Sequence, residues 1–153
     1  MPDQSLKKNI ELQALKILKI RENSFLEIKN KLTKKFPDNE VLIQEVLTEF
    51  KNKNYLSDRR FAEMYLRSKK NKGKHYIKME LLKKGISEEM VSETFRDSGY
   101  DELENAEEAA AKKFSSLLSL PEQKQKERLM RFLYSRGFSK PVIYEILNSR
   151  FKM

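Results

Sequence analysis

One short pattern of apolar, glycine and serine residues recurs three times along the chain, about 50 residues apart. Aligning Leu32, Leu81 and Leu133 brings four further sets into register: Ile28 with Ile77 and Leu129, Phe36 with Gly85 and Gly137, Pro37 with Ile86 and Phe138, and Asp38 with Ser87 and Ser139. The first repeat matches fully only after a one-residue shift in its third helix. Short units of this kind bury too little apolar surface alone and stack in series. The repeat therefore predicts tandem units instead of one large core.

Within each repeat the apolar residues follow helical spacing, and no segment alternates as a strand would. Ser24 stands three residues before Glu27, the pattern of a capping box at a helix start. Gly85 followed by Ile86 predicts a glycine-ended helix with a hydrophobic contact behind it. We expect an all-α fold of three tandem three-helix repeats in an elongated, curved array. The predicted domains are residues 1–58, 59–101 and 102–153, and the longest predicted helix runs from Glu102 to Leu118.

Several classes of protein are disfavoured by what the chain lacks. It has no cysteine, no apolar run of the roughly 20 residues that a membrane helix needs, and no apolar segment in its first residues, MPDQSLKKN. His75 is the single histidine and has only lysines nearby, and no glycine-rich phosphate loop is present. The lysine-rich segment around Gly73 is predicted to be a solvated joint. We expect a cytoplasmic protein that is not an enzyme, binds no metal or cofactor, and does not enter a membrane.

Charge is distributed unevenly along the chain, which has a net charge of +9. Residues 59–84 contain ten basic and two acidic side chains, residues 85–111 contain one basic and nine acidic, and residues 112–153 contain ten and three. A lysine-rich composition produces bulk charge without any function. A separation into positive and negative segments, however, favours a polyanionic or acidic partner.

Two sets of basic residues are the candidate partner-binding and DNA-binding positions. The first lies in the middle repeat and contains Arg59, Arg60, Arg67, Lys69, Lys70, Lys72, Lys74 and Lys78. The second lies in the last repeat and contains Lys124, Lys126, Arg128, Arg131, Arg136 and Lys140. Tyr65 and Tyr76 lie within the first set and offer rings for stacking on bases, although the spacing of Tyr65 also suits a core residue. The alternative for both sets is a solvated face, and Arg136 also suits the end of a helix.

The signature residues resemble a known family. They are the run YLSDRRFA from Tyr55 to Ala62, then Tyr65, Gly73, Ile77, Glu80-Leu81 and Lys84-Gly85-Ile86, with Ala14-Leu15, Leu18, Arg21, Ser24 and Leu32 before them and LYSRGFSKPVI from Leu133 to Ile143 after them. Over nearly the whole chain this resembles the regulatory protein RecX family. Asn54 stands where that family usually has glycine, but asparagine tolerates the same left-handed turn. Phe36 and Pro37 replace the usual glycine stop of the first repeat, so we expect a different turn there.

The resemblance implies three tandem three-helix units and a non-enzymatic modulator of the RecA recombinase. It implies binding to RecA and its filament on single-stranded DNA, inhibition of recombinase and ATPase activity, and weak binding to duplex DNA. The implied context is homologous recombination, DNA repair and the SOS response, and we expect a monomer. Two alternatives remain at this point: an autonomous DNA-binding protein of Myb-like or homeodomain-like units, and a helical adaptor for an acidic protein. Tryptophan is absent and the predicted third helices are rich in glutamate, which is unfavourable for the Myb-like alternative.

Overall fold

The computed structural model describes residues 2–151, with the side chains of residues 4–151, and this part of the chain contains helices and no strands. The helices are α1 (Pro2–Ile20), α2 (Phe25–Lys35), α3 (Glu40–Asn52), α4 (Asp58–Ser68), α5 (Lys74–Lys83), α6 (Glu88–Ser98), α7 (Glu102–Ser115), α8 (Glu122–Ser135) and α9 (Lys140–Phe151). The predicted all-α fold of three-helix repeats is confirmed. Among the described residues no helix is long and apolar enough to cross a bilayer.

The described chain divides into two compact units whose boundary passes through the middle repeat. The first unit contains the chain up to Tyr65 together with Leu81–Thr94, and the second contains Leu66–Glu80 together with the chain from Phe95 onward. The division cuts α4, α5 and α6. The predicted domain boundaries at 58/59 and 101/102 and the predicted elongated form of the array stay predictions.

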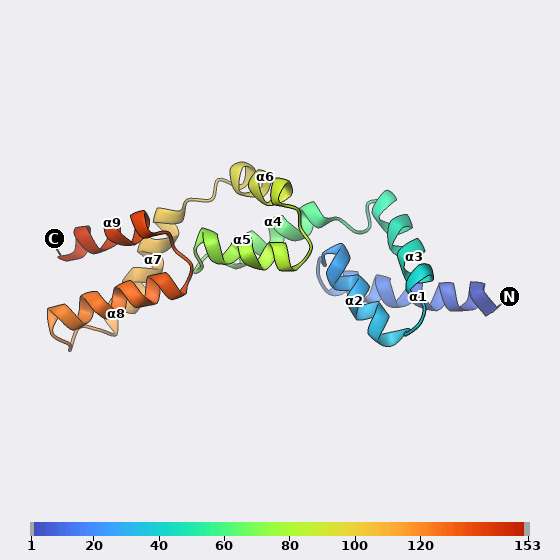
Figure 1. Ribbon diagram of the computed structural model, residues 1–153, viewed down its shortest axis with the longest axis horizontal. Helices are drawn as coiled ribbons and strands as arrows, with labels where there is room; N and C mark the ends of the chain where they lie inside the picture. The colour runs from blue at the N-terminus through green and yellow to red at the C-terminus, as the bar shows by residue number, and fades with distance from the viewer. Residues whose placement is uncertain (1, 152–153) are drawn as a thin grey trace. The chain divides into compact units, whose positions relative to one another are not determined.

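The core of the first unit is formed by α1, α2 and α3, which pack against one another (Figure 1). Its fully buried side chains include Ile10, Ile28, Leu32, Ile43 and Leu47. Ser24 Oγ accepts a hydrogen bond from the backbone N–H of Glu27 at 3.0 Å, as the capping box predicts. The reciprocal half of the box does not form, because the Glu27 carboxylate is bound by Arg21 and Lys84 instead. Only the cap on the N-terminus of α2 was therefore predicted correctly.

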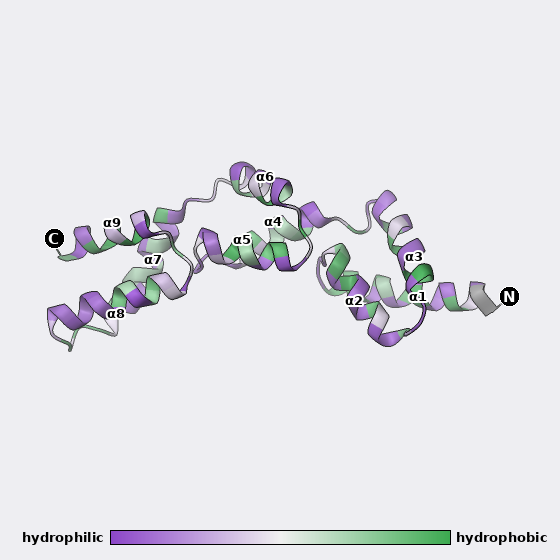
Figure 2. Ribbon diagram, in the orientation of Figure 1, coloured by the Kyte–Doolittle hydropathy of each residue, from purple (hydrophilic) through white to green (hydrophobic). Residues whose placement is uncertain are grey.

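The core of the second unit is formed by α7, α8 and α9 (Figure 1). Ala106 and Ala110 are fully buried and allow α7 to approach closely, and Leu129 and Leu133 fill the space from α8. In Figure 2 hydrophobic and hydrophilic stretches alternate along these helices, as expected of amphipathic elements with one buried face. The predicted extension of the seventh helix to Leu118 is wrong, and so is its predicted rank as the longest helix, since α7 has 14 residues and α1 has 19. After Ser115 the backbone turns tighten, with Ser116 and Leu117 donating to carbonyls three residues back.

The helix endings follow the repeat in two of its three copies. After α5 the N–H of Ile86 donates to the Leu81 carbonyl at 3.1 Å, and Gly85 has φ +84°. After α8 the N–H of Phe138 donates to the Leu133 carbonyl at 3.2 Å, and Gly137 has φ +85°. These are two copies of one glycine-ended turn. In the first repeat Pro37 has no N–H to donate, and the positive φ moves to Asp38, at +64°, so the expected difference is confirmed.

The same kind of hydrogen bond joins successive repeats at both junctions. In the first unit the N–H of Phe25, the first residue of α2, donates to the Asp58 carboxylate at the start of α4 at 2.7 Å. In the second unit the N–H of Lys74, the first residue of α5, donates to the Glu102 carboxylate at the start of α7 at 2.8 Å. Each carboxylate satisfies an N–H that has no partner within its own helix. The middle helix of one repeat is thus held by the first helix of the next.

The glycine turns complete each of these junctions. The position of a Cβ on Gly85 is occupied by Leu26, and that of a Cβ on Gly137 is occupied by the backbone and Cβ of Tyr76. Gly73 packs on Gly137 itself: its N–H donates to the Arg136 carbonyl at 2.7 Å, and the Gly137 backbone fills the space of a Cβ. The prediction of a solvated joint is therefore wrong at Gly73, which is buried. The lysines around Gly73 indicated a solvated segment, and nothing in the sequence pointed to its backbone contact with a residue 64 positions away.

Candidate functional site

The fourteen predicted basic residues do not form one uniform surface. Arg59 and Arg60 belong to the first unit, and the other twelve belong to the second. Within the units, some of these side chains are engaged by carboxylates, some lie over aromatic rings, and some are exposed.

Arg59 and Arg60 are engaged in ion pairs within the first unit. Arg59 Nη2 lies 2.6 Å from Glu93 Oε2. Arg60 Nε lies 3.0 Å from Glu22 Oε1, and its Nη atoms donate to the side chain and carbonyl of Asn54, which has φ +65°. Arg60 therefore ties α4 to the turn that precedes it. The left-handed Asn54 agrees with the expectation from the sequence.

Four other basic residues lie over aromatic rings of the second unit. The cation of Lys72 is 4.5 Å from the Tyr76 ring centroid, and that of Lys74 is 5.3 Å from the Phe95 centroid. In the last repeat Lys126 lies over Phe151 at 5.7 Å and Arg136 lies over Phe132 at 4.8 Å. Such contacts hold each cation in place without neutralising it. The positive charges of Lys72, Lys74 and Arg136 therefore remain available to an anion, whereas Lys126 also lies 3.8 Å from the carboxylate of Glu122.

The junction between the second and third repeats brings three predicted cations together. Burial lowers the pKa of Lys72, and the positive charges of Arg136 and Lys69 lower it further. We call Lys69, Lys72 and Arg136 the cation cluster. Arg136 immediately precedes Gly137, and Lys72 immediately precedes Gly73, so the glycine contact brings the backbones of Lys72 and Arg136 together. Clustered cations repel one another, and an anion bound among them relieves that repulsion.

Tyr100 makes a further contact with the backbone of the same region. Its hydroxyl donates a hydrogen bond to the Lys72 carbonyl at 3.0 Å, and its ring contacts Phe95 edge-on. Burial raises the pKa of Tyr100 to about 12, so the hydroxyl stays protonated and keeps donating at neutral pH. The backbone of the cation cluster is therefore held by Tyr100 as well as by the two glycines. Nothing in the sequence pattern singled out Tyr100 for this role.

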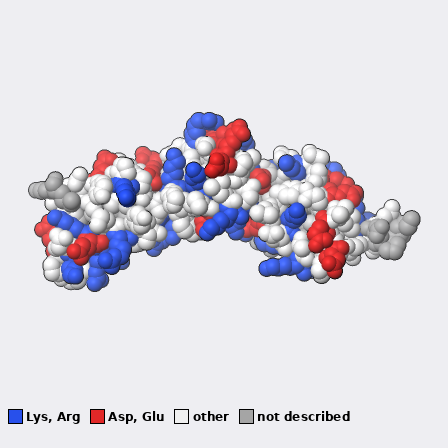
Figure 3. All heavy atoms as spheres, viewed as in Figure 1, with Lys and Arg blue, Asp and Glu red and all other residues white. Residues whose placement is uncertain are grey.

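The remaining predicted cations of the second unit are exposed, except for Lys69, which is half-buried. The exposed ones are Arg67, Lys70, Lys78, Lys124, Arg128, Arg131 and Lys140. Figure 3 shows Lys and Arg, in blue, over α8 with a few acidic residues among them. His75 is exposed, and its backbone N–H donates to the Gly137 carbonyl at 3.2 Å. Tyr65 packs against Phe61 and is half-buried, while Tyr76 is half-buried beneath Lys72.

A groove between α8 and α9 was missed from the sequence. It has a volume of about 310 Å³ and contains Met130 and Tyr134 of α8 beside Ile143 and Tyr144 of α9. The signal for it was present, since Glu127, Met130, Arg131 and Tyr134 recur at helical spacing on a face that does not enter the core. Without a facing helix, that stripe could not be distinguished from scattered surface residues.

These features define a class: a tandem helical-repeat protein with clustered basic side chains at a repeat junction. Comparison with known proteins makes the class specific. A model described as the second three-helix domain of RecX matches residues 57–94, and one described as the third three-helix domain matches residues 100–147. The chain belongs to the RecX family of regulatory proteins.

Individual relatives extend over most of the chain. The protein called Regulatory protein RecX of Chlorobium phaeobacteroides (strain BS1) is 37% identical over 156 aligned residues, which cover 99% of both chains. Its namesake in Haemophilus influenzae (strain PittGG) is 36% identical over 126 residues, covering 80% of this chain and 82% of that protein. The crystal structure of RecX from Lactobacillus salivarius has the same fold, with a TM-score of 0.79 at 22% identity over 96% of this chain and 97% of that one.

Proposed function

We propose that this protein is a non-enzymatic regulator that binds the RecA recombinase and its filament on single-stranded DNA in the cytoplasm, and that it lowers recombinase and ATPase activity. Family membership supports a regulatory role. The observation that carries the nucleic-acid part is the cation cluster, in which Lys72 and Arg136 flank the backbone contact of Gly73 with Gly137 and lie over aromatic rings, with Lys69 close to Lys72. A pre-arranged group of cations binds phosphate without first having to become ordered.

The proposed mechanism is a shift between states of the filament. A ligand changes such an equilibrium only by its difference in affinity for the two states. A protein that contacts both the phosphate backbone and the recombinase binds the assembled filament more tightly than either component alone. Strong binding to one filament conformation then slows the nucleotide cycle that passes through the other.

Recombinase ATPase activity on single-stranded DNA tests this proposal. Adding the full-length protein is expected to reduce the ATPase rate. The variant K69Q/K72Q is expected to need about tenfold more protein for half-inhibition, equivalent to about 1.4 kcal/mol of binding free energy. The matched control is K8Q/K16Q, which removes two exposed lysines of α1 and should behave as the wild type.

Two outcomes contradict the proposal. One is an ATPase rate that the wild-type protein leaves unchanged. The other is nanomolar, sequence-dependent binding to duplex DNA in the absence of recombinase, which would indicate an autonomous DNA-binding protein. Equal inhibition by K69Q/K72Q and the wild type would mean that the cation cluster does not contribute to inhibition of the recombinase.

A further inference from the structure

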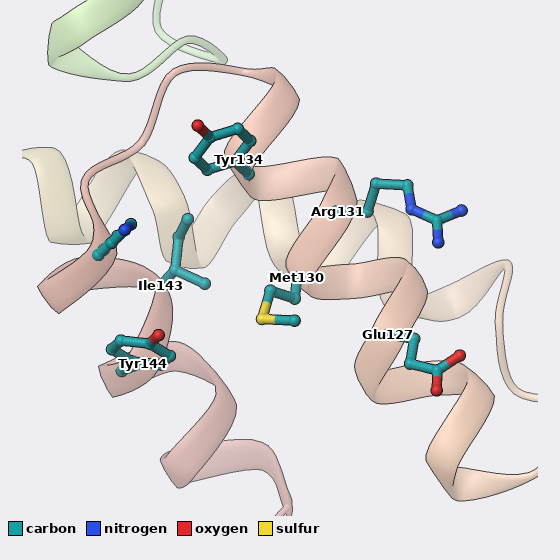
Figure 4. A pocket seen from close by; sticks show the side chains of 7 residues that line it. Glu127, Met130, Arg131, Tyr134, Ile143 and Tyr144 are labelled. Carbon is teal, nitrogen blue, oxygen red and sulfur yellow. The ribbon is translucent and has the colours of Figure 1, made fainter.

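The groove between α8 and α9 presents two tyrosine rings to solvent. Tyr134 is 65% exposed and Tyr144 is 53% exposed, and Met130 beside them is 42% exposed. Ile143 is buried and forms the floor of the groove between them (Figure 4). Large apolar side chains that gather in one exposed groove commonly mark a binding site. The rings come from two different helices, so the fold holds the rings in a fixed relation to each other.

The rim of this groove is basic. Arg131 lies next to Met130 on α8, and Lys140 is the first residue of α9, with both contributing to the lining. Lys124 is exposed two helical turns before Arg131, on the same face of α8. Among the lining residues Glu127 is the single carboxylate. The charge at the rim therefore favours a group that carries a negative charge.

The size of the groove limits what can occupy it. At about 310 Å³ it lies at the low end of the range for small-molecule sites. A helix of a partner protein would need anchors along two or more turns, whereas this groove is a short one that suits flat rings lying against its two tyrosines. The open faces of Tyr134 and Tyr144 suit an aromatic ring, because offset aromatic pairs gain free energy beyond the area that they bury. The two rings favour a flat aromatic group and the basic rim favours an anion. A nucleotide contains both, as a base and a phosphate.

We propose that this groove binds the bases of single-stranded nucleic acid, which stack on Tyr134 and Tyr144 while Arg131 and Lys140 contact the neighbouring phosphates. The inference rests on the proposed function in taking single-stranded DNA as the ligand. Every base has a π-face, so stacking here adds affinity without sequence preference. The groove thereby supplies the contact with bases, and the cation cluster adds phosphate contacts to those of Arg131 and Lys140.

Binding to paired oligomers with and without bases tests the inference. The full-length protein is titrated into a labelled oligothymidylate and into an abasic oligomer of the same length, and anisotropy gives both dissociation constants. The wild type is expected to bind the base-bearing oligomer about tenfold more tightly for each stacked base. In Y134L/Y144L this ratio should fall to about one, whereas Y134F/Y144F should retain it because phenylalanine also stacks.

The chain offers a matched control and a check on folding. Tyr55 of the first unit is 53% exposed, as Tyr144 is, so Y55L should leave the ratio unchanged. Circular dichroism and thermal melting verify that each variant is folded. If Y134L/Y144L does not fold, Y144L alone replaces one exposed ring and should give an intermediate ratio.

Two results would overturn the inference. One is equal affinity of the wild type for the two oligomers. The other is an unchanged ratio of the two affinities in Y134L/Y144L. If that variant also loses recombinase inhibition, the groove binds a side chain of the partner protein instead of a base. The ratio is measured without recombinase. A protein that binds bases through this groove but leaves the ATPase rate unchanged therefore contradicts the proposed function and not this inference.

Discussion

At the scale of single residues, Glu27 combines a structural role with an unusual acidity. Its carboxylate is 9% exposed and receives hydrogen bonds from Arg21 at 2.9 Å and Lys84 at 3.2 Å. Burial by itself would raise the pKa of Glu27, but the two cations outweigh burial and lower the pKa to about 2. Lys84 immediately precedes Gly85, so this carboxylate fastens α2 to the glycine turn of the next repeat. Its ionised form is part of the native structure of the first unit.

Acidification is therefore expected to destabilise the first unit through Glu27. The folded-state pKa, about 2, lies below the ordinary value of 4.5. The stabilisation is thus fully present above pH 4.5 and is lost as the pH falls from 4.5 towards 2. The difference corresponds to about 3 kcal/mol. In E27Q the free energy of unfolding at pH 7 should fall by about that amount, and the dependence on pH below 4.5 should become shallower.

Chemical denaturation between pH 7 and pH 2.5 measures this effect. The control is E40Q, which replaces an exposed glutamate that also lies in the first turn of its helix. An acid dependence of E27Q as steep as that of the wild type would show that other carboxylates govern acid unfolding.

At the scale of secondary-structure elements, the sequence predicts what depends on near neighbours. The glycine turns at Gly85 and Gly137, the cap at Ser24 and the apolar stripes require contacts only a few residues apart, and the structure agrees with them. The end of α7 differs from prediction because helix ends depend on weak local preferences.

The missed features depend on contacts between distant residues. The packing of Gly73 on Gly137 could not be predicted, because it joins two turns from different repeats. For the same reason the basic residues were predicted as sets, although their division among ion pairs, aromatic rings and the groove depends on the tertiary structure. The pairing of Arg59 with Glu93 shows this, since Arg59 was predicted as a binding residue with no indication of the carboxylate 34 positions away.

The repeated junction predicts equivalent effects at two distant sites. E102A should lose the hydrogen bonds that Glu102 accepts from the Lys74 N–H at 2.8 Å and the Ser139 hydroxyl at 2.7 Å. D58A should lose the bond from the Phe25 N–H. Each variant is expected to be less stable by about 1–3 kcal/mol, because a backbone donor loses its partner.

Hydrogen exchange reports the junctions separately. The Lys74 amide should exchange faster in E102A and the Phe25 amide faster in D58A, with little effect of either variant on the other site. The control is E104A, which removes an exposed glutamate from the same first turn of α7. Unchanged exchange at Lys74 in E102A would mean that water replaces the carboxylate without cost.

At the scale of the whole molecule, the net charge of +9 and its separation into segments govern association with polyanions. The cation cluster and the two cations of the groove provide about five phosphate contacts. Each contact with a single strand adds about 0.7 to the slope of log affinity against log salt, so the slope should be about −3.5. K69Q/K72Q should reduce its magnitude by about 1.4.

Titration of single-stranded DNA from 50 to 200 mM salt measures this slope. K8Q/K16Q again serves as the control, because it lowers the net charge equally at exposed positions of α1. A slope that falls equally in both variants would mean that total charge, and not the fixed cluster, determines the affinity.

The junction contacts also bear on how such a chain can evolve. Each junction uses a free N–H at the start of a middle helix on one side, and a carboxylate with a glycine turn on the other. The two surfaces of a junction differ. Each repeat therefore contacts the next repeat through the start of its middle helix, and contacts the previous repeat through its carboxylate and glycine turn. A gene duplication that copies a whole repeat would copy both sides together and create a matched junction at once. The number of repeats can therefore change in a single genetic step, whereas the spacing within a repeat is fixed by the turn that every junction requires.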